Sequence, residues 1–268
     1  MNLDVSGLKF FIIIGILMML ILTVSFLLVF IINQQKKLQY QQQMQLLRES
    51  QQNQLIEAAI KSEEIERHRI AEVLHDEVGA ILSSAKLHLM SIKEENMDKH
   101  DKQLHNKGRE LLDEGIHKVR GISHNLHSNI LKEFGLNEAI KHFTGKLTHD
   151  SLIAASFDLD KSYTGQYEEK DITIYRIIQE LINNMIKHSA ATNISIASNF
   201  SGKDLEITLV NDGKGITQEE FESLRYKQEG MGLKNIQNRI FLLRGTIQFQ
   251  YESGTQKIII HIPINNNE

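Results

Sequence analysis

The pair of residues with the clearest chemistry in the chain is His75 followed directly by Asp76. Twelve histidines occur, ten of them from His68 to His149, so composition alone does not select one. His75 lies beside Leu74, one step off the apolar face of a predicted helix, which leaves its ring partly exposed. An imidazole becomes a nucleophile when a carboxylate holds its other ring proton and fixes the tautomer. The pair predicts a nucleophilic histidine, although an inert surface pair gives the same pattern.

A second group of polar residues lies on a predicted helix in the C-terminal half. Glu180 and Asn184 are four residues apart, so they project from one helix face. An amide oxygen there can bind Mg²⁺, a cation that prefers oxygen ligands and keeps water and phosphate as the others. Lys187 can neutralise phosphate charge. An amphipathic helix with ordinary polar residues would show the same spacing.

Two glycine-containing segments follow this helix. Residues 211–216, Asn-Asp-Gly-Lys-Gly-Ile, end a predicted strand, where Asp212 can accept the adenine amino proton and the glycines let backbone approach a nucleotide. Residues 230–235, Gly-Met-Gly-Leu-Lys-Asn, can present backbone amides and a helix N-terminus to phosphates. Each segment alone is most simply a turn.

Together these segments resemble a known family. Residues 67–79, Arg-His-Arg-Ile-Ala-Glu-Val-Leu-His-Asp-Glu-Val-Gly, are similar to the phosphoacceptor motif of bacterial two-component sensor histidine kinases. The similarity is to the subfamily that includes the nitrate/nitrite and desaturase-regulating sensors. Residues 119–136 resemble its connection to the catalytic domain, with Ser128 where proline is common. Residues 175–188 resemble the N box of the GHKL (Bergerat) ATPase fold, and the glycine segments resemble its two glycine boxes, all in family order.

The resemblance implies ATP-dependent autophosphorylation of His75 and transfer of the phosphoryl group to an aspartate of a response regulator with a helix-turn-helix output domain. Asp76 would be the general base that accepts the Nδ1 proton. ATP and Mg²⁺ are implied, the metal on Asn184. The resemblance also implies that the stretch between the glycine boxes, Thr217 to Glu229, is a mobile lid. The nucleotide-binding residues that the resemblance implies are Glu180, Asn184, Lys187, His188, Asp212, Gly213, Gly215, Gly230, Gly232 and Leu233.

One position departs from the family in a way that bears on function. Five residues after the phosphohistidine many relatives carry a glutamine that orients water for dephosphorylation of the regulator, and here the residue is Ala80. A methyl group cannot orient water. The sequence therefore predicts weak phosphatase activity.

An apolar run near the N-terminus predicts a transmembrane helix over residues 8–32. From Phe10 to Ile32, 20 of 23 residues are hydrophobic and none is charged, which is enough to span a bilayer. A cleaved signal peptide is the alternative, but its apolar core is about 7–15 residues long. Lys36, Lys37 and Arg48 follow the run, so the positive-inside rule places the catalytic part in the cytoplasm of a single-pass protein of the inner or plasma membrane. Too few residues precede the span for an external domain, so a separate protein is a candidate sensor.

Three further regions follow. Residues 33–62 are glutamine-rich and predict a helical, weakly coiled-coil linker, with disorder as the alternative. Residues 63–133 carry two apolar stripes and predict a helical hairpin, the dimerisation and phosphotransfer domain. Two helices bury little by themselves, so we expect a homodimer that forms a four-helix bundle. The first stripe is Leu74, Val78, Ile81, Ala85, Leu89 and Ile92, and the second is Leu104, Leu112, Ile116, Val119, Ile122, Leu126 and Ile130.

Residues 134–268 predict the ATP-binding domain, an α+β sandwich with helices on one face of a mixed sheet. We expect helices at 171–188 and 232–243. The expected strands are 152–158, 193–200, 205–211, 246–251 and 257–263.

Composition limits the alternatives. The chain of 268 residues has no cysteine, which excludes disulfides, thiolate metal sites, iron–sulfur clusters and cysteine nucleophiles. A net charge of −4 argues against direct binding of nucleic acid. The single proline, Pro263, lies near the C-terminus, so long helices are permitted. Two other functions remain open: a membrane-tethered scaffold with a degenerate ATP fold, and a GHKL protein-serine kinase of the anti-sigma type.

Overall fold

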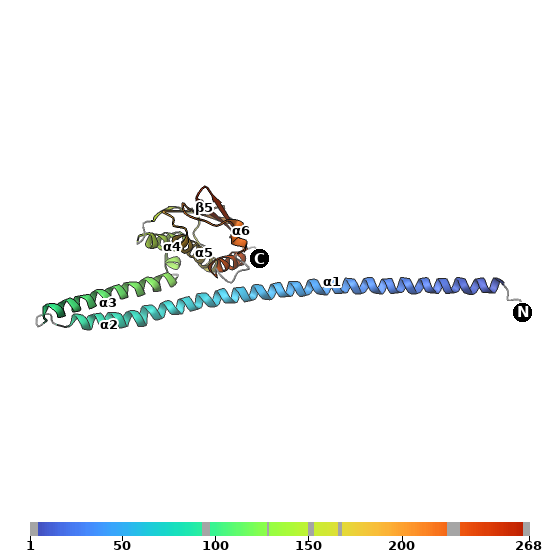
Figure 1. Ribbon diagram of the computed structural model, residues 1–268, viewed down its shortest axis with the longest axis horizontal. Coiled ribbons are helices and arrows are strands. Elements are labelled where there is room, and N and C mark those ends of the chain that lie inside the picture. The colour runs from blue at the N-terminus through green and yellow to red at the C-terminus, as the bar shows by residue number, and fades with distance from the viewer. Residues whose placement is uncertain are drawn as a thin grey trace. The chain divides into compact units, whose positions relative to one another are not determined.

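The computed structural model describes residues 5–92, 97–127, 129–149, 153–165, 168–223 and 231–264, so Ser128 and Gly230 lie outside the described residues. The chain divides into two compact units, Met1–Ile56 and Glu57–Glu268. Helix α1 (Val5–Glu72) is continuous over 68 residues and contributes to both (Figure 1). Within the described residues it is the one helix apolar and long enough to cross a membrane, with a mean hydropathy of 3.0 in its most apolar window. The described large apolar side chains from Phe10 to Ile32 are exposed, as a lipid-facing segment requires, whereas Ala71 near the other end of the helix is buried.

The second unit begins with a helical hairpin. Helix α1 passes into a π-helical turn, η1 (Val73–Val78), and then into α2 (Gly79–Met90), which packs against α3 (Lys99–Leu126). Helix α3 begins before the predicted apolar stripe because Asp98 caps it, accepting a hydrogen bond of 2.8 Å from the Asp101 amide. Near its other end, the buried Ser123 hydroxyl donates to the Ala71 carbonyl at 2.9 Å. The predicted hairpin is confirmed, whereas the π-helical turn was not predicted.

The remainder is a five-stranded sheet with helices on one face (Figure 1). The strands lie in the order β1-β2-β3-β5-β4, with β1 parallel to β2 and the other pairs antiparallel. This confirms the expected α+β fold with a mixed sheet. The strands are β1 (Ala154–Asp158), β2 (Asn193–Phe200), β3 (Asp204–Asn211), β4 (Thr246–Glu252) and β5 (Thr255–Pro263). The helices are α4 (Asn129–His149), α5 (Glu168–His188), α6 (Gln218–Ser223) and α7 (Met231–Leu242).

The core lies between the sheet and its helices. Along β3 the residues Leu205, Ile207 and Leu209 are at most 1% exposed, and the residues between them face the other side. This period of two follows from the pleat of a strand. Helix α5 covers the same face with Ile177, Ile178, Leu181 and Ile182, all at most 2% exposed. The positions of both elements along the chain agree with the sequence pattern to within about three residues.

Two helices were not predicted. Helix α4 is bent at Gly135, where φ is +78°, and this left-handed residue interrupts the apolar spacing that would have indicated a helix. Helix α6 lies within the segment that we expected to be a lid, where Phe221 anchors it by stacking on Phe249 of β4. The rest of that segment, residues 224–230, lies outside the described residues.

A buried arginine joins the helical hairpin to the sheet and its helices. Arg176 of α5 is 3% exposed, and its guanidinium donates to both carboxylate oxygens of Glu64 in α1, at 2.9 and 2.5 Å. It also donates to the carbonyls of Asn125 (3.3 Å) and Leu126 (2.8 Å), at the C-terminus of α3. A guanidinium suits this place because unsatisfied carbonyls and the negative end of the helix dipole meet there.

A second arginine makes a similar contact. Arg239 of α7 is 4% exposed and donates to Glu63 Oε2 at 2.7 Å. The other oxygen of Glu63 accepts from Arg67 on the same helix. Burial alone raises the pKa of Glu63, but Arg239 and Arg67 outweigh burial and hold the pKa below its ordinary value.

Candidate functional site

The predicted nucleophile lies in the π-helical turn of the hairpin. His75 and Asp76 are both exposed, and their Nδ1 and Oδ1 atoms are 2.7 Å apart. The Gly79 amide donates to the carbonyl of Leu74, five residues earlier, which makes the turn one residue wider than an α-helical turn. When Nδ1 carries the proton and donates it to Asp76, the lone pair of Nε2 faces outward. The geometry can therefore present a basic nitrogen to a large substrate.

A cavity of about 590 Å³ lies between α5 and the ends of β3 and β5. Glu180, Asn184 and His188 follow one another at intervals of four residues, so α5 turns one polar face toward it. The other lining residues are Leu181, Met185, Ser189, Asn211, Lys214, Gly215, Ile216, Gly232, Leu233, Phe249, Gln256 and Ile258. The cavity thus combines an apolar wall with polar groups of both charges, which is typical of sites for small ligands.

The structure brings together most of the predicted binding residues. Glu180, Asn184, His188, Gly215, Gly232 and Leu233 line this cavity. Lys187 is exposed and, with Gly213, is not among the lining residues, whereas Lys214 is. Lys214 was not predicted, although it lies between the two glycines of the first glycine segment.

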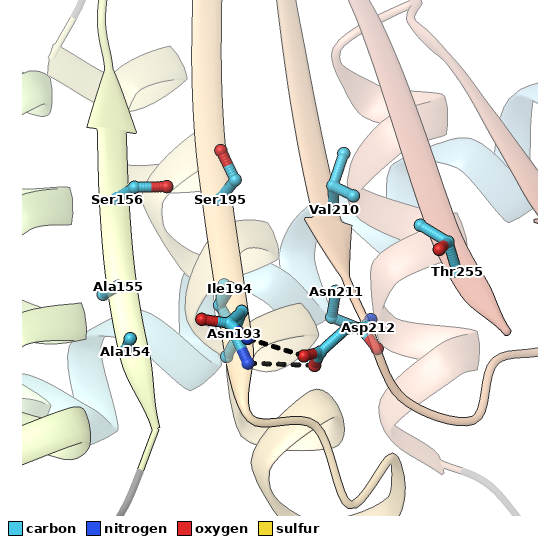
Figure 2. Close-up of a pocket in the computed structure, with 10 residues that line it drawn as sticks. All are labelled: Ala154, Ala155, Ser156, Asn193, Ile194, Ser195, Val210, Asn211, Asp212 and Thr255. Atoms are coloured by element: carbon cyan, nitrogen blue, oxygen red, sulfur yellow. Dashed lines mark hydrogen bonds between the residues drawn. The ribbon is translucent and has the colours of Figure 1, made fainter.

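Asp212, the predicted partner of the adenine amino group, is not among the residues that line this cavity. It lies at a shallower hollow of about 190 Å³ on the sheet (Figure 2). Its carboxylate accepts from the Thr192 amide (2.7 Å) and hydroxyl (2.6 Å) and from the Asn193 amide (2.9 Å) and side chain (2.7 Å). These hydrogen bonds hold the pKa of Asp212 far below its ordinary value. The carboxylate therefore ties the end of β3 to the start of β2.

The residue at the cavity is its neighbour, Asn211. Side chains alternate along a strand, so Asn211 continues the buried face of Leu205, Ile207 and Leu209, and Asp212 faces away from it. Asn211 is 2% exposed, and its Oδ1 accepts from the Gly213 amide at 3.0 Å. The alternation from 205 to 211 was the signal in the sequence that could have identified Asn211.

Two positions beside the cavity must be glycine, because neighbouring atoms lie too close to the backbone to leave room for a Cβ. A Cβ on Gly213 would lie 2.3 Å from the Ser189 carbonyl oxygen, which itself accepts from the Lys214 amide at 2.7 Å. A Cβ on Gly215 would lie 1.9 Å from Oε1 of the buried Gln256. Gln256 cannot swing away because Oε1 accepts from the Ile216 amide and Nε2 donates to two carbonyls. Backbone therefore forms this wall of the cavity.

The donor set fits a magnesium ion only in part. Glu180 and Asn184 offer a carboxylate and an amide oxygen from adjacent turns of α5. In the described part of the chain, no group of three or more His, Cys, Asp or Glu side chains could hold a metal. Mg²⁺ bound here would need phosphate oxygens and water to complete its six ligands, which is its usual mode of binding beside a nucleotide.

Two family models match the chain. Residues 169–266 match the histidine kinase-, DNA gyrase B- and HSP90-like ATPases, and residues 66–131 match a family described as histidine kinase. The first range contains every residue that lines the cavity, and the second contains His75 and Asp76.

Curated relatives are similar over the same part of the chain. The signal transduction histidine-protein kinase/phosphatase UhpB of Salmonella typhimurium is 24% identical over 79% of this chain and 41% of its own length. Sensor histidine kinase MctS of Rhizobium johnstonii is 26% identical, over 75% and 44%. Sensor histidine kinase NarS of Mycobacterium tuberculosis is 22% identical, over 79% and 48%. The chain therefore spans less than half the length of these relatives.

Among solved structures, the catalytic domain of histidine kinase ThkA is 20% identical and has a TM-score of 0.42. The match covers 48% of this chain and 92% of that one.

Gly215→Ala tests the cavity wall. The added methyl must displace Gln256 and so break its hydrogen bond to the Ile216 amide, and we expect ATP to bind about tenfold more weakly or worse. The measurement is competition with a fluorescent ATP analogue on the full chain in detergent. Gly145→Ala in α4 is the matched control, because its Cβ would meet open space. Equal ATP affinity of the two variants would contradict this description of the wall.

Proposed function

We propose that this chain, which belongs to the sensor histidine kinases by its phosphoacceptor helices and its ATPase fold, transfers the γ-phosphoryl group of ATP to His75 and then to an aspartate of a response regulator. The observation that carries the proposal is the 2.7 Å contact between His75 Nδ1 and Asp76 Oδ1 inside the histidine kinase match. The family resemblance found in the sequence is confirmed by the comparisons. What we propose beyond the family is the identity of the two phosphoryl acceptors, His75 and an aspartate of a response regulator.

In the proposed reaction, His75 Nε2 attacks the γ-phosphorus of ATP. A bond forms between Nε2 and phosphorus, the bond from phosphorus to the bridging oxygen breaks, and ADP leaves with that electron pair. Attack makes the ring cationic, so Asp76, hydrogen-bonded to Nδ1, takes the Nδ1 proton. The exposure of both side chains lets a nucleotide-bearing domain approach the ring.

The cavity would hold ATP with its base among the apolar residues and its phosphates at the polar rim. Lys214 and His188 line that rim and can meet phosphate oxygens, and Glu180 and Asn184 would hold Mg²⁺. Mg²⁺, when bound, would neutralise charge on the phosphates and so favour transfer. The sequence-based roles of Lys187, Gly213 and Gly230 stay predictions.

A homodimer is proposed from the apolar surface of the hairpin. Ile81, Leu111 and Ile122 are more than half exposed in one copy, as are Leu87 and Leu104. A second hairpin packed on this surface would bury these side chains and complete a four-helix bundle. Two-component histidine kinases dimerise and act on response regulators, and a helix-turn-helix output domain is our proposal for the regulator here.

Membrane anchoring is proposed from the exposed apolar part of α1. Residues 8–32 would cross the membrane once, with the linker 33–62 and the catalytic part in the cytoplasm.

Replacement of His75 tests the function directly. We expect γ-labelled ATP to give an acid-labile label on the parent chain and none on His75→Gln, because the glutamine side chain lacks the nucleophilic nitrogen. His88→Gln is the matched control, an exposed histidine on α2, and it should label like the parent. Acid-stable label on another protein would support the serine kinase instead. Complete absence of label from the parent would support the scaffold.

Asp76→Asn tests the general base. An asparagine can still accept the Nδ1 hydrogen bond but cannot take the proton, so we expect autophosphorylation to slow by about 10²- to 10⁴-fold. Initial labelling rates at saturating ATP measure this. Glu77→Gln makes the same change at the next, exposed residue and should keep the parent rate. An Asp76→Asn rate within twofold of the parent would remove Asp76 from the mechanism.

Ala80→Gln tests the predicted weakness of the phosphatase. Ala80 is exposed one turn after His75, so a longer amide there can orient water. We expect the parent to dephosphorylate its regulator slowly and the variant to do so about tenfold faster or more. The loss of label from a regulator phosphorylated by this chain is followed with time. Ala58→Gln on α1 is the control, and rapid dephosphorylation by the parent would refute the idea.

A further inference from the structure

Asn211 is a buried polar side chain that lines the cavity together with several apolar residues. It is 2% exposed, and Leu181, Ile216, Phe249 and Ile258 line the same cavity. The charged residues of the cavity, Glu180 and Lys214, suit phosphates and a metal rather than a base. A flat nucleobase fits best against the apolar residues, where its edge meets the amide of Asn211.

The hydrogen bonds determine which end of this amide faces the ligand. The Gly213 amide is a donor, so the atom that accepts from it, 3.0 Å away, must be Oδ1. The Nδ2 group therefore points to the other side, and it has no partner among the described residues. The nearby Gln256 differs because its Oε1 and Nε2 are both used by backbone groups. Asn211 thus offers the cavity a free donor.

An amide hydrogen-bond donor and a carboxylate recognise different groups at the 6-position of a purine. Adenine carries an amino donor at C6, whereas guanine carries an oxygen acceptor there. A carboxylate accepts from the adenine amino group and repels the guanine oxygen. An amide donor can instead meet N1 of adenine or O6 of guanine, so it does not reject the 6-oxo group.

We propose that Asn211 sets the nucleobase specificity of the cavity, and that its Nδ2 donor lets guanine nucleotides bind as well as adenine nucleotides. This inference rests on the proposed function, because it assumes that the cavity holds a nucleoside triphosphate. It concerns the base alone and leaves the phosphoryl transfer to His75 unchanged.

The test compares ATP and GTP on the full chain in detergent, by competition with a fluorescent ATP analogue. We expect the parent to bind GTP within about tenfold of ATP. Asn211→Asp should raise the ratio of the GTP to the ATP dissociation constants by about tenfold or more, because a carboxylate repels O6. Asn129→Asp is the matched control, the same change at an exposed residue of α4, and it should keep the parent ratio.

The outcomes separate the two proposals. A parent that binds neither nucleotide refutes the proposed function. A parent that binds ATP but discriminates against GTP by more than a hundredfold refutes only this inference, and it needs no variant to do so. If Asn211→Asp remains folded by circular dichroism and keeps the parent ratio, Asn211 does not read the base.

Discussion

The buried guanidinium of Arg176 is the interaction on which the second unit depends. It joins three elements that are distant in sequence, since it binds Glu64 of α1, two carbonyls at the end of α3, and Gln179 within its own helix α5. A buried charge is tolerated only when its hydrogen bonds are satisfied, so none of these partners can leave without a large cost. Arg239 also binds α1, through one hydrogen bond to Glu63, but its buried Nε has no hydrogen-bond partner among the described residues. The cavity-bearing fold is thus held at a defined place on the helix that leads to His75.

The two arginine contacts restrict how the ATPase fold can move along the hairpin that carries His75. Glu63 and Glu64 lie about three helical turns before His75 on the same helix. Any movement of the ATPase fold along the hairpin must therefore break or exchange the two arginine contacts. The π-helical turn at His75 is the other irregular point of this helix, and π-bulges are often found at functional sites. The two arginine contacts and the irregular turn at His75, the proposed nucleophile, therefore lie within one stretch of chain.

Much of the fold could be predicted because its elements are local. Period-two alternation located β2 and β3 almost to the residue, and period-3.6 spacing located α5 and α7. Helix α4 was missed because Gly135 takes a left-handed conformation within it, which no pattern of apolar residues reveals. The π-helical turn was missed because it differs from an α-helix in its backbone hydrogen bonds, such as that from the Gly79 amide to the Leu74 carbonyl, and not in its residue types. Such features depend on backbone conformation more than on residue type.

The sequence by itself determined that His75 and Asp76, the proposed nucleophile and its base, lie side by side, since neighbouring residues need no fold to meet. It also determined the apolar run of α1 and the spacing of Glu180, Asn184 and His188 on one helical face. Only the tertiary structure decided that Asn211 rather than Asp212 reaches the cavity, and that Lys214 rather than Lys187 lines it. The reason is that adjacent strand residues face opposite sides, and which side is the binding side depends on where α5 and α7 pack.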